Sequence, residues 1–293
     1  MEHLYDAAKV FRQSFHQWRQ PSKVQISKTP EAMALELAHY VRKNFLPGSA
    51  AREVYFFIRK TPELTNKLNG WGKHTFEKFC LDNGLRIVKL EFRPKTTIRG
   101  DYVFPNLIAG WKIKKINKVW VTDICYIFGN NGILVGYATA LIEVYSRLLL
   151  GLHFSETMRA IDTSIPVLKQ ALEMRKEMDL SETVIHSDGG KQYIETNFLK
   201  LRDKHKMLSS MAENCYENAF AESFNDTLKN HMLTQFNLNS FKQLKKKEKF
   251  IKYAYNHNKP HTGIQRFTPI EYEMHIADLK SCQRTSVEIK VIN

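Results

Sequence analysis

Three acidic residues of this sequence lie in surroundings in which their carboxylates could bind a hard cation. Asp188 ends the apolar run "VIHS", Asp123 stands within an alternating apolar run, and Glu222 lies early in a segment with helical periodicity. A buried carboxylate without a partner costs several kcal/mol, so each position needs a donor or a cation nearby. Three carboxylates brought together repel one another unless cations lie between them, and oxygen-only ligands select Mg²⁺ or Mn²⁺ over Zn²⁺. The pattern therefore predicts a carboxylate metal site, provided that the fold brings the three acids together.

The elements that must position these acids follow from the periodicity of the second half of the chain. The segment "KVWVTDICYIF" alternates and sets Asp123 in the middle of one apolar face of a strand. Asn130, Asn131 and Gly132 form a hairpin turn, and two more apolar strands follow around "EVYSR", so we expect a three-stranded antiparallel meander. The run "TVIHSD" is a short apolar strand that is best placed in parallel beside the first strand.

Helices and one further strand complete this α/β pattern. We expect helices at 160–178 and 196–205, a strand at 206–210, and a helix from about Asn218, which would cap it. On this last helix a spacing of three to four residues places four polar side chains on one face, namely Glu222, Asn225, Asp226 and Lys229. The predicted sheet is mixed and five-stranded, flanked by helices, with a polar helix face available at its strand ends.

The first part of the chain has helical periodicity throughout. We expect helices at 30–45, with Thr29 as N-cap, at 50–59, from Thr61 and Pro62, and at 72–82, where Asn83 and Gly84 form the C-cap. Short helices with tight connections and basic residues favour a helix-turn-helix-like unit. Its last helix would then enter a major groove with Lys73 and His74 near its start; the alternative is a small bundle that only packs.

Changes in periodicity and composition along the sequence divide the chain into four parts. Residues 1–92 form the helical, DNA-binding region, and 93–112, with Pro, Gly and charge but little periodicity, form a linker. Residues 113–275 form the catalytic core, and 276–293 form a C-terminal tail.

Composition limits the classes of protein to which the chain can belong. A net charge of +14 and a pI near 9.5 favour a polyanionic partner, with nucleic acid as the leading candidate. The four cysteines are scattered singly, which predicts neither a disulfide framework nor a cysteine-rich zinc site. No apolar run approaches the roughly 20 residues of a membrane span, and the N-terminus lacks the apolar stretch of a signal peptide. We therefore expect a cytoplasmic protein without a membrane partner.

Five segments, in order and over roughly Val119 to Tyr272, resemble the catalytic core of bacterial insertion-sequence transposases of the retroviral-integrase superfamily. They are "VWVTDICYI", "ALIEVYSRLLLGLHF", "VIHSDGGKQY", "SMAENCYENAFAESFNDTLKNH" and "YAYNHNKPHTGIQRFTPIEY". The upstream "LPGSAAREVYFFI" and "KFCLDNGLRI" are similar, less specifically, to the helix-turn-helix segment that precedes this core. The resemblance implies an RNase H-like fold and a DDE triad carried by Asp123, Asp188 and Glu222.

The chemistry that the resemblance implies is phosphoryl transfer at DNA ends. Two Mg²⁺ ions, or Mn²⁺, held by the triad would activate the attacking oxygen and stabilise the leaving one. Water as the nucleophile nicks the element end, and a DNA 3′-hydroxyl joins strands. The partners would be double-stranded DNA, as terminal repeats and target, bound by a homo-oligomer associated with the bacterial nucleoid. The sequence carries neither a P-loop nor a dinucleotide-binding glycine fingerprint, so no nucleotide cofactor is expected.

Several further residues are candidate DNA contacts, each with a structural alternative. Lys229, two turns after Glu222, would grip the DNA end near the scissile phosphate, and helix solvation is its alternative. His186 would orient a phosphate or pack in the core. The remaining candidates are Asn225, Lys191 and Gln192, together with Asn256, Lys259 and His261 in the segment "YNHNKPHTGIQRFTPIEY", for which packing is the alternative.

The sequence departs from the family pattern at a few positions, none of them in the triad. The 33 residues between Asp188 and Glu222 are slightly fewer than usual, Gly189 replaces a common arginine, and Ala212-Glu213 replaces a more basic pair. These changes would alter DNA contacts and leave the chemistry intact. Two alternatives stay open: an RNase H-like nuclease without strand transfer, and a catalytically silent, domesticated DNA-binding protein.

Overall fold

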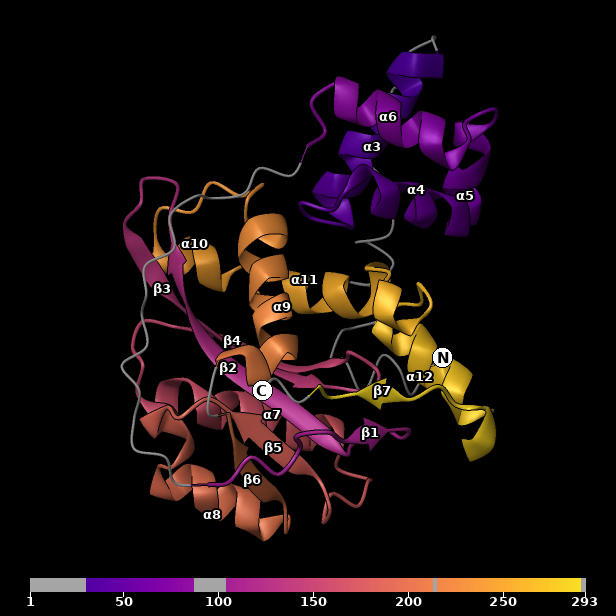
Figure 1. Cartoon of the computed structure of the whole chain (residues 1–293). Helices are drawn as coiled ribbons and strands as arrows, with labels where there is room; N and C mark the ends of the chain where they lie inside the picture. The colour runs from indigo at the N-terminus through magenta and orange to yellow at the C-terminus, as the bar shows by residue number, and fades with distance from the viewer. Residues whose placement is uncertain (1–29, 87–103, 213–214, 291–293) are drawn as a thin grey trace.

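The computed structural model describes residues 30–86, 104–212 and 215–290. Residues 30–86 form a helical unit that lies against one end of a larger α/β unit, residues 104–290 (Figure 1). The helical unit consists of α3 (Pro30–Asn44), α4 (Ala51–Lys60), α5 (Pro62–Thr65), a 3-10 turn (Asn66–Leu68) and α6 (Lys73–Asp82). The expected all-helical N-terminal region is confirmed; Thr29, the expected N-cap of α3, lies outside the described residues.

The helical unit has its own apolar core, to which every helix contributes. Leu37 of α3, Ile58 of α4 and Phe76 of α6 are fully or almost fully buried in it. The expected C-cap of α6 is confirmed, because Gly84 has a φ of +82° and the Leu85 amide bonds the Cys80 carbonyl at 2.8 Å. This core fixes the four helices relative to one another.

The α/β unit contains a mixed five-stranded sheet in the order β4-β3-β2-β5-β6. Its strands are β2 (Val119–Phe128), β3 (Leu134–Glu143), β4 (Leu149–Ser155), β5 (Val184–Ser187) and β6 (Leu208–Met211). Strands β2, β3 and β4 form the expected antiparallel meander, whereas β5 and β6 run parallel to β2. The hairpin turn between β2 and β3 contains Gly132 at a φ of +75°. This order and these directions are those of the RNase H-like fold that the sequence predicts.

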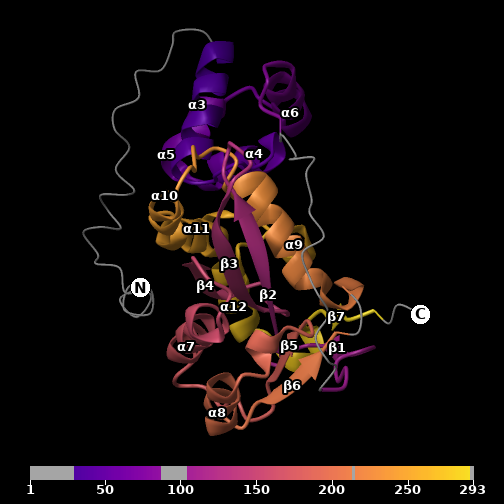
Figure 2. The ribbon, with the colours of Figure 1, turned by 90° about the vertical axis from the view of Figure 1, so that its left-hand side faces the viewer.

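Helices cover both faces of the sheet (Figures 1 and 2). One face packs against α7 (Ser164–Met174) and α8 (Thr196–Lys204). The other packs against α9 (Ala219–Thr227), its π-helical continuation (Leu228–Met232), α10 (Phe241–Lys245), α11 (Glu248–Tyr253) and α12 (Pro269–Ala277). Strand β2 serves both layers, because Trp120 points into the first and Val119 and Val121 point into the second. Successive side chains of β2 therefore point alternately into the two apolar cores on opposite faces of the sheet.

A second, two-stranded sheet was not expected. Strand β1 (Lys112–Ile113) pairs in antiparallel fashion with β7 (Val287–Glu288), joining the end of the predicted linker to the predicted tail. Strands of two residues leave no periodicity in the sequence, so only the tertiary structure shows this pairing. The domain boundaries proposed above stay predictions.

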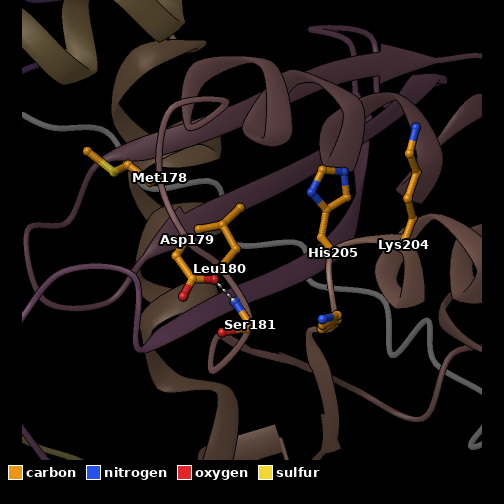
Figure 3. A pocket seen from close by; sticks show the side chains of 7 residues that line it. Met178, Asp179, Leu180, Ser181, Lys204 and His205 are labelled. Atoms are coloured by element: carbon orange, nitrogen blue, oxygen red, sulfur yellow. Dashed lines mark hydrogen bonds between the residues drawn. The ribbon is translucent and has the colours of Figure 1, made fainter.

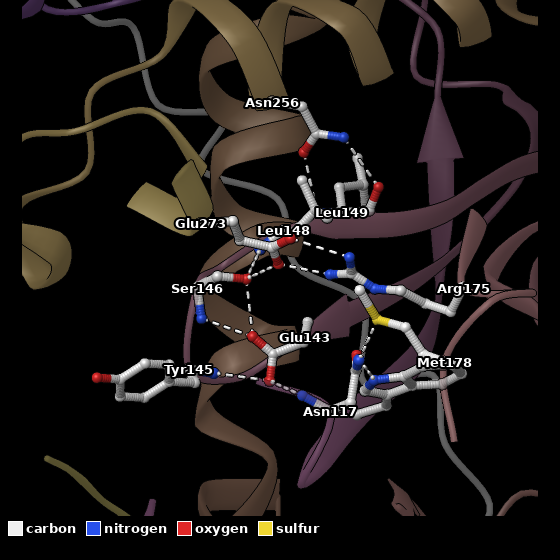
Figure 4. A network of polar contacts seen from close by, with 11 residues as sticks. Asn117, Glu143, Tyr145, Ser146, Leu148, Leu149, Arg175, Met178, Asn256 and Glu273 are labelled. Carbon is white, nitrogen blue, oxygen red and sulfur yellow. Dashed lines mark hydrogen bonds and ion pairs between the residues drawn. The ribbon is translucent and has the colours of Figure 1, made fainter. Parts of the chain in front are cut away.

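Buried polar groups tie the β3–β4 corner to helices α7 and α12 (Figure 4). Ser146 Oγ lies 2.7 Å from Glu143 Oε2 and 2.7 Å from Glu273 Oε1. Arg175, at the end of α7, donates from Nη1 to Glu273 Oε2 at 2.9 Å and is only 5% exposed. The C-terminal helix α12 is therefore held to the sheet by charge as well as by apolar contact.

Helix α12 begins at Pro269 and is capped by side chains at its start. Thr268 Oγ1 accepts from the Glu271 amide at 3.3 Å, and Glu271 Oε2 accepts from the Thr268 amide at 2.9 Å, which is a complete capping box.

Among the helices of the described ranges, none combines the length and the apolar composition that a membrane span requires.

Candidate active site

Strands β2 and β5 bring two of the three predicted acids side by side. Their parallel register pairs Val119 with Val184 and Val121 with His186. Continuing this register by two residues on each strand sets Asp123 beside Asp188, which directly follows the last residue of β5. The carboxyl end of a short central strand thus delivers Asp188 to the level of Asp123.

Helix α9 brings the third acid. The helix packs against β2 and β3 through Ala221 and Phe224, both 1% exposed, and Glu222 lies in its first turn on the exposed side. Asn218 is the N-cap residue, as expected, but its side chain does not cap the helix. Its Nδ2 instead donates to the Thr122 carbonyl at 3.0 Å, so it ties the start of α9 to strand β2 beside Asp123. The sequence-based role of Asn218 is corrected accordingly.

Both oxygens of Asp123 accept a hydrogen bond from the protein. Oδ1 accepts from the Ile124 amide at 2.8 Å, and Oδ2 accepts from Asn225 Nδ2 at 2.7 Å. Asn225 is 6% exposed, and it lies one turn after Glu222 on α9. The sequence identified Asn225 as part of the polar helix face; the structure turns its amide towards a carboxylate rather than towards solvent.

The three carboxylates and Lys229 act on one another electrostatically. Burial, followed by the charges of Asp188 and Glu222, raises the pKa of Asp123 to about 7, while the Ile124 amide and Lys229 oppose this rise. Burial also raises the pKa of Asp188, against the hydrogen bond from the Gly190 amide, and the pKa of Glu222, against the charge of Lys229. Burial is thus the main cause of all three shifts, and only Asp123 also has its pKa raised by the charges of the other two acids.

The donor set fits a hard divalent cation in its chemistry. The triad offers only carboxylate oxygens, and part of the rise in the pKa of Asp123 comes from the charges of Asp188 and Glu222, which such a cation would offset. In the described parts of the chain, no three His, Cys, Asp or Glu side chains are arranged as a ready-made metal cluster. The acids therefore lie within electrostatic reach of one another without forming a closed coordination shell.

Buried polar groups pack behind the carboxylates, on the core side of the site. The sequence did not indicate them. Thr122 Oγ1 donates to the Ala140 carbonyl at 2.8 Å and lies 3.4 Å from the hydroxyl of Tyr193. Tyr193 is 3% exposed, and burial, together with the charges of Asp188 and Asp123, raises its pKa well above the ordinary value. Tyr193 occurs in the same "VIHSDGGKQY" segment as Asp188, but only the fold shows that it reaches β2.

Comparison with known families places the chain. Residues 114–215 and residues 206–269 match two families, each described as "Integrase core domain", and together these matches span more than half of the chain. The chain belongs to the insertion-sequence transposases of the retroviral-integrase superfamily.

Curated relatives of this transposase come from several bacteria. A 31 kDa uncharacterized protein of insertion element IS600 from Shigella sonnei is 25% identical over 270 residues, which are 90% of this chain and 94% of that protein. The transposase for insertion sequence element IS904 from Lactococcus lactis is 30% identical over 173 residues, 58% of this chain and 66% of that one. Transposase InsF for insertion sequence IS3A from Escherichia coli is 32% identical over 115 residues, 39% of this chain and 38% of that one.

Solved structures that match the chain include a viral integrase domain and a viral intasome. The HTLV-2 integrase catalytic core domain in complex with magnesium covers 57% of this transposase and 98% of that chain, at 14% identity and a TM-score of 0.40. The simian T-cell lymphotropic virus intasome covers 76% of this transposase and 74% of that chain, at 16% identity and a TM-score of 0.44.

The predicted DNA contacts of the transposase have different surroundings. His186 is fully buried, its Nδ1 lies 2.9 Å from Ser210 Oγ, and burial lowers its pKa to about 4, so its placement favours the packed alternative. Lys191 is exposed beside Asp188, whereas Gln192 Nε2 donates to the Met158 carbonyl at 3.0 Å. Lys73 and His74, in the first turn of α6, are half-buried and exposed, respectively.

The candidates in the segment after α11 are held by protein groups. Lys259 is 7% exposed and pairs with Glu53 of α4. Burial and the charges of Lys259 and Arg147 lower the pKa of His261 to about 3. Asn256 bonds the Leu149 amide at 2.9 Å and the Leu149 carbonyl at 3.0 Å (Figure 4), so it satisfies the backbone of β4. This placement of Asn256 favours the packing alternative.

Figure 3 shows a shallow depression in the α/β unit. It has a volume of about 360 Å³ and is lined by 178–181 and 204–206. Residues 178–181 precede β5, whereas Asp188 follows that strand, so the depression lies at the opposite end of β5. Its position separates it from the candidate active site of the transposase.

Proposed function

We propose that this protein catalyses metal-dependent phosphoryl transfer at the ends of its insertion element. Water as the nucleophile would nick the DNA, and a DNA 3′-hydroxyl would join the cut end to a target. The observation that carries the proposal is the convergence of Asp123, Asp188 and Glu222 from β2, the end of β5 and α9, with Lys229 beside them.

The three carboxylates are the residues that would hold the metal, as two Mg²⁺ or Mn²⁺ ions. Such ions lower the pKa of an attacking water and offset negative charge on the attacking and leaving oxygens. Support comes from the raised pKa of Asp123. Burial is its main cause, and the charges of Asp188 and Glu222 add to it, so bound cations would offset this negative charge.

The other residues of the site would orient the carboxylates and bind the DNA. Asn225 Nδ2 and the Ile124 amide fix both oxygens of Asp123, and the Asn218 bond to Thr122 fixes α9 against β2. Lys229, two turns after Glu222, already lowers the pKa values of Asp123 and Glu222, so it lies where it can contact a phosphate at the reacting end. Lys191 would add a second, exposed cation near Asp188.

The partner would be double-stranded DNA, as terminal repeats and as target. A net charge of +14 favours binding to the phosphate backbone, and the helical unit offers α6, with Lys73 and His74 in its first turn, as the element that enters a groove. Joining requires two DNA ends in one assembly, so we infer a homo-oligomer on DNA.

The test is a cleavage and strand-transfer assay with purified protein, Mg²⁺ and labelled duplexes that carry the element ends. We expect nicked and joined products from the wild type and a loss of more than about 10³-fold in Asp188→Asn, because losing one metal ligand removes several kcal/mol of charge stabilisation. Asp179→Asn, at an exposed aspartate in the depression at the other end of β5, is the matched control and should retain activity.

Two other results would contradict the proposal. Cleavage without joining under all conditions would support a nuclease, and DNA binding without cleavage by the wild type would support a silent DNA-binding protein.

A further inference from the structure

Helix α4 of the helical unit is held to the α/β unit by an ion pair at each of its ends. Glu53, in its first turn, pairs with Lys259, and Lys60, its last residue, donates to Glu271 Oε2 at 2.7 Å. Lys259 lies in the segment between the end of α11 and the start of α12, and Glu271 lies in the first turn of α12. Helix α4 therefore lies along this segment, on the side of the helical unit that faces the core (Figures 1 and 2).

The Glu53–Lys259 pair is the buried member of this contact. The side chain of Lys259 is 9% exposed and that of Glu53 is 22% exposed. Glu53 divides its oxygens between two tasks, because Oε2 accepts from the Ala50 amide at 3.2 Å and caps α4, whereas Oε1 accepts from Lys259. A buried pair with such demands on geometry favours one arrangement of the two units over others, since breaking it leaves a charge without a partner.

The same arrangement brings the helical unit against the helix that carries Glu222. Gly48 has a φ of +62°, and a Cβ at this position would lie 1.4 Å from the backbone oxygen of His231, in the π-helical continuation of α9. Asn258 Nδ2 donates to the Phe45 carbonyl at 3.0 Å, which adds a second contact to the same loop. The loop before α4 thus contacts the continuous helical segment that carries Glu222 in its first turn and Lys229 in its π-helical continuation.

Helix α6, the proposed recognition helix, is fixed to α4. Arg52 of α4 donates from Nη2 to Glu77 of α6 at 2.9 Å, and Phe76 packs in the shared core with Val54 and Ile58. A rigid path therefore leads from α6 through α4 to Lys259 and to α9.

We propose that the Glu53–Lys259 pair, with the Gly48 contact on α9, sets the register between the DNA sequence bound by the helical unit and the phosphate attacked at the carboxylates. This inference rests on the proposed function. Lys259 is then a positioning residue, which acts through Glu53 and the helical unit rather than by touching the reacting DNA.

The docking is tested without any cleavage, by hydrogen–deuterium exchange of the full chain. In Lys259→Gln and in Glu53→Gln we expect at least about a tenfold faster exchange of the backbone amides in 45–60 and in 228–232. These two segments lie on opposite sides of the contact, so losing the ion pair should let both open more often. Gln at 53 keeps an oxygen for the Ala50 amide, so the cap of α4 survives. Gly48→Ala, which leaves the ion pair in place, should have the same effect. Unchanged exchange in all three variants would overturn the inference.

The register is tested by mapping the cut at single-nucleotide resolution on labelled element ends. A displacement of about 1 Å can cost 10²-fold in rate, so we expect the main cut to weaken about tenfold or more in both single variants, with new cuts at neighbouring nucleotides. The double variant, in which two amides can bond each other, should recover part of the main cut. Lys118→Gln, which removes an ion pair with Glu182 inside the α/β unit, is the matched control and should cut at the wild-type position.

Two outcomes separate this inference from its rivals. If Lys259→Gln weakens DNA binding while Glu53→Gln leaves binding and cut position unchanged, Lys259 contacts DNA directly and the register role is wrong. If the wild type does not cleave, the proposed function fails and the register role fails with it, whereas the exchange result still decides whether the pair holds the two units together.

Discussion

Asn225 Nδ2 lies 2.7 Å from Asp123 Oδ2, so an amide on helix α9 is bonded to the central carboxylate on strand β2. The bond joins the two elements that carry Asp123 and Glu222. It orients one oxygen of Asp123, while the Ile124 amide orients the other at 2.8 Å. Partners that orient a metal-binding carboxylate in this way tune its affinity for the ion.

The first prediction concerns this amide. In Asn225→Ala, Asp123 loses one of its two hydrogen bonds, and its carboxylate is free to rotate. We expect cleavage at fixed Mg²⁺ to fall by about 10- to 100-fold, with a higher Mg²⁺ concentration needed for half-maximal rate. Asn230→Ala is the matched control, because Asn230 is a similarly buried amide nearby, bonded to Asp226 at 2.6 Å, and we expect it to leave the Mg²⁺ dependence unchanged.

The second prediction concerns the stability of the metal-free protein. The pKa of Asp123 is about 7 in the folded protein and near 3.8 in the unfolded chain, so between these values the folded protein holds a proton that the unfolded chain releases. The contribution of Asp123 to the free energy of unfolding therefore falls as pH rises from about 4 to about 7, and the loss is complete above pH 7. Asp123→Asn removes this dependence, which urea titrations of both proteins across this range would measure.

Asp123→Asn should make the metal-free protein more stable and should remove its response to Mg²⁺. At pH 8 without Mg²⁺, we expect Asp123→Asn to unfold about 2–4 °C above the wild type, the shift that 1 kcal/mol produces in a domain of 150–250 residues. Mg²⁺ should raise the Tm of the wild type, by an amount equivalent to about 2.7 kcal/mol at 100 times its Kd, and should leave the variant almost unchanged. An equal response of both proteins to Mg²⁺ would show that Asp123 does not hold the ion.

The third prediction concerns Lys229. In Lys229→Gln, DNA ends should bind more weakly, and the slope of log K against log salt should become less steep by about 1, because one phosphate contact is lost. Loss of this cation should also raise the pKa values of Asp123 and Glu222 further, since its charge now lowers both. Lys200→Gln, at an exposed lysine of α8, serves as the control; an equal change in both salt slopes would place Lys229 outside the DNA contact.

The fourth prediction concerns the polar network at the β3–β4 corner (Figure 4). Arg175→Met leaves Glu273 buried without its cation, beside Glu143, so we expect a loss of about 3–5 kcal/mol in the free energy of unfolding. Lys176→Met is the matched control, because the neighbouring Lys176 is exposed and lies 3.9 Å from Glu173, where an ion pair contributes about 1 kcal/mol at most. Urea unfolding followed by circular dichroism compares the two, and similar losses would mean that the buried network does not hold α12.

Local signals in the sequence determined the elements of this protein and the candidate acids. The alternating run at β2 set Asp123 in an apolar row, and that row indeed faces α9. The C-cap of α6 was predicted because such signals act over a few residues of chain. The order of strands and helices followed, since each element carries its own period.

Only the tertiary structure decided the relationships between residues far apart in the chain. Asn225 and Asp123 are 102 residues apart, and Lys259 and Glu53 are 206 residues apart. Side-chain type and helical face place Asn225 on a polar stripe, but whether it meets solvent, DNA or a carboxylate depends on how α9 lies across β2. Periodicity indicates which side of an element is buried, whereas the packing of the whole chain decides which partner that side contacts. The sequence therefore predicted the three acids, but it did not predict the contacts that orient them.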